Sequence, residues 1–246
     1  MREILGRRRK LSLRRGERPA VLTAALVCAT EWRWPVLPGV GLRPRGRAGG
    51  ARGCGCQHAD CAAPGAHPFD PGLLAATTDA RMVRWWWTNR PDAPVLLATG
   101  GRAPCAVSLP AVAGARALVA LDRAGVRLGP VVATPERWTL LVAPYSLEVL
   151  GELLHRQDWV PGSLRFHGEG GYVALPPSPT GAGRVRWERA PRAYGGAPRR
   201  SAAVSALRGA RTGVVPRPWL PDISTVVDVL VEETAGTPGG GSRLTH

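Results

Sequence analysis

The order of the elements predicted between residues 105 and 167 is the strongest constraint on how this chain can fold. Apolar runs and helical periodicity predict six elements in the order β-α-β-β-α-β. They are Cys105–Leu109, Ala111–Ala124, Val131–Thr134, Trp138–Ala143, Ser146–Gln157 and Leu164–His167. This is the split-βαβ, or ferredoxin-like, order, in which the first and third strands lie at the centre of the sheet. Many unrelated proteins share it, so the order predicts a fold and not a function.

Segments on either side are predicted to complete an α/β (α+β) protein. Strands are expected at Trp34–Leu37, Val95–Ala98, Tyr172–Leu175 and Arg184–Trp187, and helices at Ala20–Thr30, Asp79–Asn89 and Asp222–Thr234. The interval Gly39–Pro68 is dense in Gly, Pro, Cys and His and is expected to be a loop. We therefore divide the chain into a basic flexible arm (1–19), a domain (20–190) containing the loop (39–68) and a palm-like unit (105–176), and an Arg/Gly/Pro-rich tail (191–246) with a helix at 222–234.

Three consecutive tryptophans, Trp85 to Trp87, fall on one of these predicted helices. Nucleic-acid bases can stack on such rings. However, adjacent residues of a helix point in different directions, so at least one indole is expected to face the core. Core packing is the preferred interpretation of this motif.

Positive charge is concentrated in three segments. The formal charge is +15, and all but one of the 33 Lys and Arg residues are arginine. Residues 1–20 hold eight cations and two acids, residues 43–52 four arginines and no acid, and residues 184–211 eight arginines and one acid, which leaves the remaining residues at −2. A GC-rich genome explains arginine over lysine but not the shortage of acids. Basic segments on a nearly neutral body favour contact with phosphates that is independent of base sequence.

The N-terminus has two features of a secretion signal. Arg7–Lys10 is similar to a twin-arginine motif, and Ala20–Ala29 has the length of an apolar signal core. The charged residues between them and the Trp32-Arg33-Trp34 that follows favour a basic arm and a helix of the fold instead. No run approaches the roughly 18–20 apolar residues that span a bilayer. We expect a cytoplasmic protein, with nucleoid association as an option, and no membrane partner.

Cysteine and histidine gather in the predicted loop as Cys54-x-Cys56-x4-Cys61-x5-His67. Three thiolates and one imidazole match the closed shell of a structural Zn²⁺ site. The spacing differs from the usual pair of CxxC motifs, and a reduced loop or a disulfide is the alternative. Three cysteines in eight residues and an odd total of five cysteines favour zinc. The other two, Cys28 and Cys105, lie in predicted elements and are expected in the core.

A series of short motifs resembles the bifunctional DNA primase/polymerase N-terminal (prim-pol) family of the archaeo-eukaryotic primase superfamily, actinobacterial type. The matching residues are Trp34–Pro38 with Pro44, Cys54 to Pro68, Ala76–Asp79, Trp85-Trp86, Ala98–Gly100, Gly168–Ala174, Pro176–Ser178 and Trp187. Their order and spacing extend over roughly residues 20–191. The resemblance implies a palm with the split-βαβ order predicted above, and template-directed nucleotidyl transfer on that palm.

The acids that this activity requires are missing from the expected strands. The resemblance implies two Asp on the first central strand, a His on the third and an acid on a later strand, because polymerising primases bind two divalent metals. Here the first strand reads Cys105–Pro110 without an acid, and the third reads Trp138–Val142 without His. The later strand, Leu164–His167, carries Arg165 and no acid. We therefore treat Cys105, Ser108, Trp138 and Arg165 as degenerate active-site positions and assign no catalytic residue.

Three functions follow from these observations. The first is a catalytically degenerate prim-pol-like protein that binds DNA or RNA without sequence preference, or replication proteins. Its expected phosphate contacts are Arg7, Arg8, Arg9, Arg14, Arg15, Arg199 and Arg200. The second is an active primase/polymerase using Mg²⁺ or Mn²⁺ with acids from Asp79, Asp122 or Glu169. The third is a regulatory protein-interaction module whose basic tails only keep it soluble.

Overall fold

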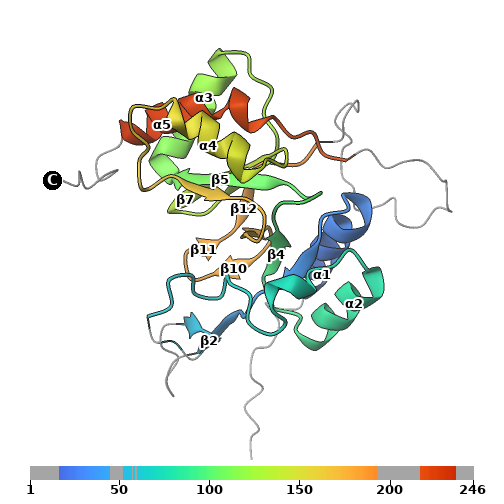
Figure 1. The fold of residues 1–246 in the computed structure, drawn as a ribbon. Coiled ribbons are helices and arrows are strands. Elements are labelled where there is room, and N and C mark those ends of the chain that lie inside the picture. The colour runs from blue at the N-terminus through green and yellow to red at the C-terminus, as the bar shows by residue number, and fades with distance from the viewer. Residues whose placement is uncertain (1–16, 45–51, 57, 59, 193–216, 237–246) are drawn as a thin grey trace, which may run out of the picture.

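The computed structural model describes residues 17–44, 52–56, 58, 60–192 and 217–236 (Figure 1). The helices are α1 (Glu17–Leu26), α2 (Ala80–Asn89), α3 (Ala111–Arg123), α4 (Leu147–His155) and α5 (Val227–Ala235), with shorter turns η1 (Val27–Glu31), η2 (Leu73–Ala75) and η4 (Ile223–Thr225). The strands are β1 (Val36–Pro38), β2 (Leu42–Pro44), β3 (Arg52–Cys54), β4 (Val95–Ala98), β5 (Cys105–Pro110), β6 (Val131–Ala133), β7 (Arg137–Val142), β8 (Arg165–His167), β9 (Tyr172–Leu175), β10 (Pro179–Thr180), β11 (Gly183–Arg184) and β12 (Arg186–Arg189). The combination of helices and antiparallel sheets confirms the predicted α+β class.

The larger sheet has the strand order β12-β6-β7-β5-β8, and every neighbouring pair is antiparallel. We call it the palm sheet. Its last four strands have the split-βαβ order, with β5 and β7 in the central positions as predicted from the sequence. β12 extends the sheet beyond β6. The element order in the sequence was therefore sufficient to identify the two central strands.

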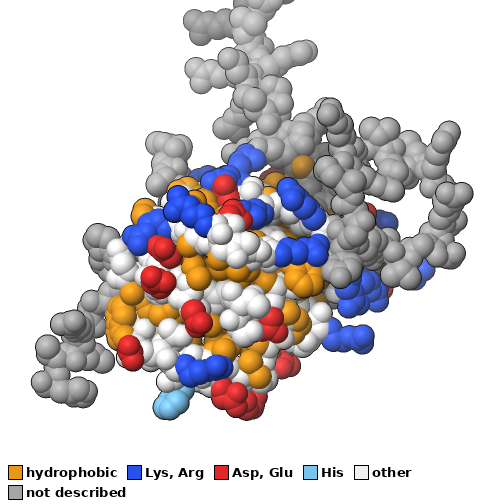
Figure 2. Space-filling model, turned by 90° about the horizontal axis from the view of Figure 1, so that it is seen from above, with side chains coloured by type: hydrophobic (Ala, Val, Ile, Leu, Met, Phe, Trp, Pro, Cys, Tyr) orange, Lys and Arg blue, Asp and Glu red, His pale blue; other side chains and the backbone are white. Residues whose placement is uncertain are grey.

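The two faces of the palm sheet pack against different layers, because successive side chains of a strand point to opposite sides. Cys105, Val107 and Leu109 of β5 join a core with α3, α4 and α5, which cover one face (Figure 1). Ala106 of β5 and Leu141 of β7 instead join the core of the second layer. On the outer surface of α3, α4 and α5, basic, acidic and apolar side chains are interspersed (Figure 2).

The second layer is a three-stranded sheet of order β1-β4-β9 with α1 and α2 packed beside it. α2 begins at Ala80 because the Asp79 carboxylate accepts hydrogen bonds from the N–H groups of the next turn, at Arg81 and Met82. Trp86 and Trp87 are buried in this layer, whereas Trp85 is 61% exposed. Core packing of the tryptophan motif is therefore confirmed for two of its three members.

The loop expected over residues 39–68 contains regular structure. Its described part includes an antiparallel hairpin in which Leu42 of β2 pairs with Cys54 of β3. The prediction of a loop throughout was wrong there, because three-residue strands are too short to show an alternating pattern. The helix expected over 222–234 is observed as η4 followed by α5, and Leu230 and Val231 of α5 belong to the core against α3. The proposed division into arm, domain and tail stays a prediction.

No helix among the described residues is long and apolar enough to cross a bilayer.

Candidate functional site

Cys54, Cys56, Cys61 and His67 come together as the sequence spacing predicted. One ligand atom from each lies within 4.8 Å of the others, and Cys54 Sγ is 3.3 Å from His67 Nε2. Within the described ranges, this is the one group of three or more His, Cys, Asp or Glu side chains close enough to hold a metal ion. The residues form a group that could bind a metal such as zinc.

The surrounding backbone orients this Cys₃His cluster. Gly65 donates its N–H to Cys54 Sγ at 3.2 Å, and Gly65 has a positive φ of 77° that favours glycine. His67 Nδ1 lies 2.8 Å from the carbonyl oxygen of Pro68. When Nδ1 carries the proton and donates to that carbonyl, Nε2 keeps its lone pair toward the cysteines, as in metal-binding histidines generally.

The thiols of the Cys₃His cluster differ in acidity. Burial by itself raises the pKa of Cys54, but hydrogen bonds from the N–H groups of Cys56 and Gly65 and from the neighbouring thiols lower it to about 6. Burial, together with its hydrogen bonds to Cys54 and Cys56, raises the pKa of Cys61 to about 11. At neutral pH the cluster without a metal therefore holds a thiolate at Cys54 beside a thiol at Cys61.

A second constellation lies on the palm-sheet face that points away from α3, α4 and α5. We call Ser108, Arg137, Arg165 and His167 the palm basic cluster. Ser108 pairs with Arg165, and Ala106 pairs with His167, in the register of β5 with β8. Arg137 comes from β7, where it pairs with Pro110. Directly opposed residues of adjacent strands share a face, so these side chains gather over the central strands.

Arg137 is the most tightly held member of the palm basic cluster. Its Nε donates to Ser108 Oγ at 2.9 Å, and its Nη2 donates to the carbonyl oxygens of Ser108 and Ser163 at 2.7 Å each. All three acceptors are uncharged. Burial, with a smaller contribution from Arg165, lowers the pKa of Arg137 to about 10, which leaves it cationic at neutral pH. A fixed guanidinium thus lies on the central strands beside a second arginine.

His167 is neutral in this environment. Burial, followed by the positive charges of Arg137 and Arg165, lowers its pKa to about 4. Nearby, the Ser163 hydroxyl is buried and has no hydrogen-bond partner among the described residues. The cluster therefore combines two guanidinium groups and a neutral imidazole, and the unpartnered Ser163 hydroxyl lies beside it.

The four degenerate positions do not form one group. Ser108 and Arg165 are paired in the palm basic cluster, but Cys105 and Trp138 face the opposite side and pack in the core with α3. Burial raises the pKa of the Cys105 thiol, and the side chain is fully buried, as expected for a core cysteine. Cys28, 2% exposed, is also a core residue as predicted.

Arg137 was not among the predicted site residues, because the strand was expected to begin one residue later, at Trp138. A signal was present, because Arg137 precedes Thr139 by two residues and shares its face if the strand starts one residue earlier. The alternative metal-binding acids are dispersed over the fold. Asp79 caps α2, Asp122 forms an ion pair with Arg189, and Glu169 lies in the turn after β8.

The arginines expected to contact phosphates lie outside the described residues. They are Arg7, Arg8, Arg9, Arg14, Arg15, Arg199 and Arg200. Their role stays a prediction.

Comparison with known proteins identifies the family. The family model described as "Bifunctional DNA primase/polymerase, N-terminal" matches residues 25–200, which is more than half of the chain and includes both the Cys₃His cluster and the palm sheet. Searches of curated proteins and of solved structures found no match. The family match agrees with the motif series and the split-βαβ palm. The chain belongs to the bifunctional DNA primase/polymerase N-terminal family.

Proposed function

We propose that this protein is a non-catalytic prim-pol domain that binds the phosphates of nucleic acid through its palm basic cluster. The observation that carries the proposal is the pairing of Ser108 with Arg165 on β5 and β8, beside the half-buried guanidinium of Arg137. In polymerising members, acids on these strands reach phosphates through bound metal ions. Guanidinium groups bind phosphate oxygens directly, so this palm needs no bridging cation.

The electrostatics of the cluster support an anionic ligand. The three hydrogen bonds of Arg137 go to neutral oxygens, so no carboxylate neutralises it through them. Arg165 is exposed and adds a second positive charge. No ion pair among the described residues joins an acid to Arg137 or Arg165. Two such cations repel Mg²⁺ and attract phosphate. The unpartnered Ser163 hydroxyl is a further donor for a bound oxyanion.

Two basic segments, which lie mostly outside the described residues, support the same role. The segments 1–20 and 184–211 carry most of the excess arginine. Cationic segments of this kind contact the backbone of DNA or RNA without reading bases, and their binding weakens steeply with salt. Replication proteins on the same nucleic acid are the partners that this proposal implies, in the cytoplasm and in association with the nucleoid.

Fluorescence anisotropy with labelled single-stranded DNA, double-stranded DNA and RNA at 50 mM salt tests the proposal. Arg165→Glu reverses one charge on an exposed side chain and should weaken binding about tenfold or more. The matched control is Arg156→Glu, because Arg156 is exposed at the C-cap of α4, on the opposite face of the palm sheet. Equal affinities of the wild type and the Arg165 variant would refute palm binding.

A primer-synthesis and extension assay with Mg²⁺ and Mn²⁺ tests the absence of catalysis. We expect no nucleotide incorporation, since the three alternative acids lie at the N-cap of α2, on α3 and in the turn after β8. Incorporation that is abolished by substituting Asp79, Asp122 or Glu169 would instead establish an active polymerase with displaced acids.

We also propose that the Cys₃His cluster holds a structural Zn²⁺. Three sulfur ligands and one Nε2 complete a tetrahedral shell, which leaves no open position for a substrate or catalytic water. Such an ion would join the β2–β3 hairpin to the segment around His67. Its contribution would be to the stability of this part of the domain and not to a reaction.

A further inference from the structure

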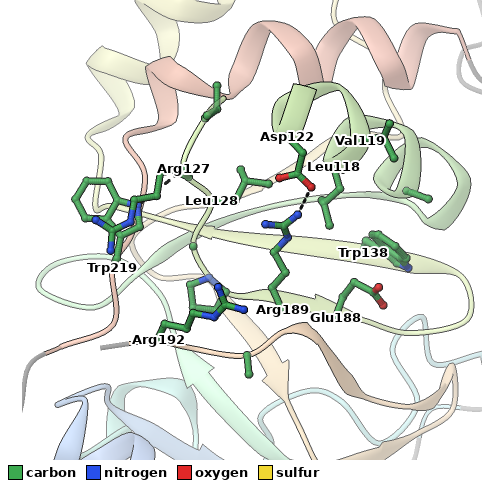
Figure 3. A pocket seen from close by; sticks show the side chains of 15 residues that line it. Leu118, Val119, Asp122, Arg127, Leu128, Trp138, Glu188, Arg189, Arg192 and Trp219 are labelled. Carbon is green, nitrogen blue, oxygen red and sulfur yellow. Dashed lines mark hydrogen bonds and ion pairs between the residues drawn. The ribbon is translucent and has the colours of Figure 1, made fainter. Parts of the chain in front are cut away.

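A cavity of about 1,040 Å³ lies on the opposite side of the palm sheet from the palm basic cluster. α3, the segment 126–130, β12 and the chain around Trp219 enclose it (Figure 3). We call it the α3–β12 pocket. Its size is at the upper end of the range for small-molecule sites. The nucleic-acid function proposed above makes no use of it.

One wall of the α3–β12 pocket is apolar and rigid. Leu118, Leu128 and Trp138 contribute to it. Trp138 lies against Gly114 of α3 so closely that a Cβ at Gly114 would be 2.6 Å from Trp138 Cβ. The indole is therefore fixed by the helix backbone and forms a flat aromatic surface in the pocket.

A second aromatic ring is fixed at the other end of the pocket. Trp219 donates its backbone N–H to the carbonyl oxygen of Arg192 at 3.3 Å. Its carbonyl oxygen would be 3.0 Å from a Cβ at Gly129, so the two segments touch closely. The guanidinium carbon of Arg127 is 4.6 Å from the centre of the Trp219 ring, an arginine–aromatic stack.

Arginines line the side of the pocket formed by β12. Arg189 extends across it to form an ion pair with Asp122 of α3, and Arg192 points toward the same space (Figure 3). Glu188 also lines the pocket and forms an ion pair with Arg186. None of the ion pairs found among the described residues involves Arg192. The pocket thus combines aromatic surfaces with guanidinium groups. Its two carboxylates, Asp122 and Glu188, each form an ion pair with an arginine.

We propose that the α3–β12 pocket binds a nucleoside 5′-phosphate unit. The base stacks on the indole surfaces, as bases do on aromatic platforms, and the phosphate binds Arg189 and Arg192. The unit is either a free nucleotide or one residue of a single strand, since both present the same base and phosphate. This inference goes beyond the proposed function, because the pocket and the palm basic cluster lie on opposite faces of the palm sheet.

Isothermal titration calorimetry with AMP, GMP, CMP and UMP, and with a single-stranded oligonucleotide, tests the proposal. Arg192→Glu should weaken nucleotide binding at least about tenfold, since it replaces a phosphate ligand by a repelling charge. Arg192 is exposed, so the variant should fold. The matched control is Arg123→Glu, because Arg123 is exposed on α3 next to Asp122 but does not line the pocket.

The arms of the experiment separate the possible results. If mononucleotides bind, and Arg192→Glu weakens this binding while Arg165→Glu leaves it unchanged, the pocket is a nucleotide site. If the oligonucleotide shows this pattern and the mononucleotides do not bind, the pocket is a strand-binding site. If inorganic phosphate binds as tightly as the nucleotides, base stacking contributes nothing to the affinity and that part of the proposal is overturned. The pocket proposal is overturned if Arg192→Glu changes neither the nucleotide affinity nor the oligonucleotide affinity. If, in addition, Arg165→Glu abolishes oligonucleotide binding, the palm proposal still holds.

Discussion

Arg137 Nε donates a 2.9 Å hydrogen bond to Ser108 Oγ across the two central strands of the palm sheet. The same guanidinium reaches the carbonyl oxygens of Ser108 and Ser163, so a single cation joins β7, β5 and the segment before β8. In this chain, a fixed positive charge lies where polymerising relatives are expected to gather acids around metal ions.

Arg137→Gln should lower the free energy of unfolding by about 1–3 kcal/mol, because it removes the donors that satisfy carbonyl oxygens at Ser108 and Ser163. Arg137→Lys keeps the charge but loses the planar fork, so it should restore part of the nucleic-acid affinity and little of the stability. Urea denaturation and anisotropy measure the two effects. Wild-type stability in the Gln variant would show that these hydrogen bonds contribute nothing.

His167 should make the fold less stable at acidic pH. Its folded pKa of about 4 lies below the ordinary value of 6.5, so the unfolded chain takes up a proton between these values while the folded chain does not. The free energy of unfolding has its full value above pH 6.5 and falls as the pH drops toward 4, by at most about 3 kcal/mol. Between pH 7.5 and 4.5, the urea midpoint of the His167→Gln variant should change less with pH than that of the wild type. A His155→Gln control, on an exposed residue of α4, should retain the wild-type slope.

Removal of the proposed Zn²⁺ should destabilise the region around the Cys₃His cluster. Cys61→Ser should reduce the zinc content, measured by elemental analysis of the purified protein, from about one ion per chain to near zero. The control is His58→Ala, because His58 is exposed and does not belong to the cluster. Chelation should lower the melting temperature of the wild type and of His58→Ala, and leave Cys61→Ser unchanged. Equal zinc content in all three proteins would exclude this site.

Two glycines on helices should respond to alanine in opposite directions. Alanine at Gly114 places a Cβ 2.6 Å from Trp138 Cβ and should destabilise the fold by about 1–3 kcal/mol while weakening binding in the α3–β12 pocket. Alanine at Gly151 of α4 meets no atom within 4 Å and should stabilise the fold by about 0.5–1 kcal/mol. Thermal denaturation measures both. A stabilised Gly114→Ala variant would show that Trp138 moves freely and does not form a fixed surface.

Local signals predicted much of this protein. The apolar pattern from Cys105 to His167 identified strands β5 to β8 of the palm sheet, and the spacing of the Cys and His residues identified the group that could bind a metal. The missing acids on the central strands are also visible in the sequence. Each of these features depends on residues close together in the chain, where periodicity, capping and ligand spacing apply. The three-residue strands β2 and β3 lacked such a signal.

The sequence by itself determined the order of the elements, the Cys₃His group and the absence of acids from β5 and β7. Only the tertiary structure decided which side chains meet. Cys105 and Trp138 face the helices while Ser108 and Arg165 share the other face, because cross-strand register and alternation assign each side chain to a face. Arg127 stacks on Trp219, 92 residues away, because the segment around Trp219 packs against the residues that follow α3. Contacts of this kind depend on how the layers close over one another, and no local propensity encodes them.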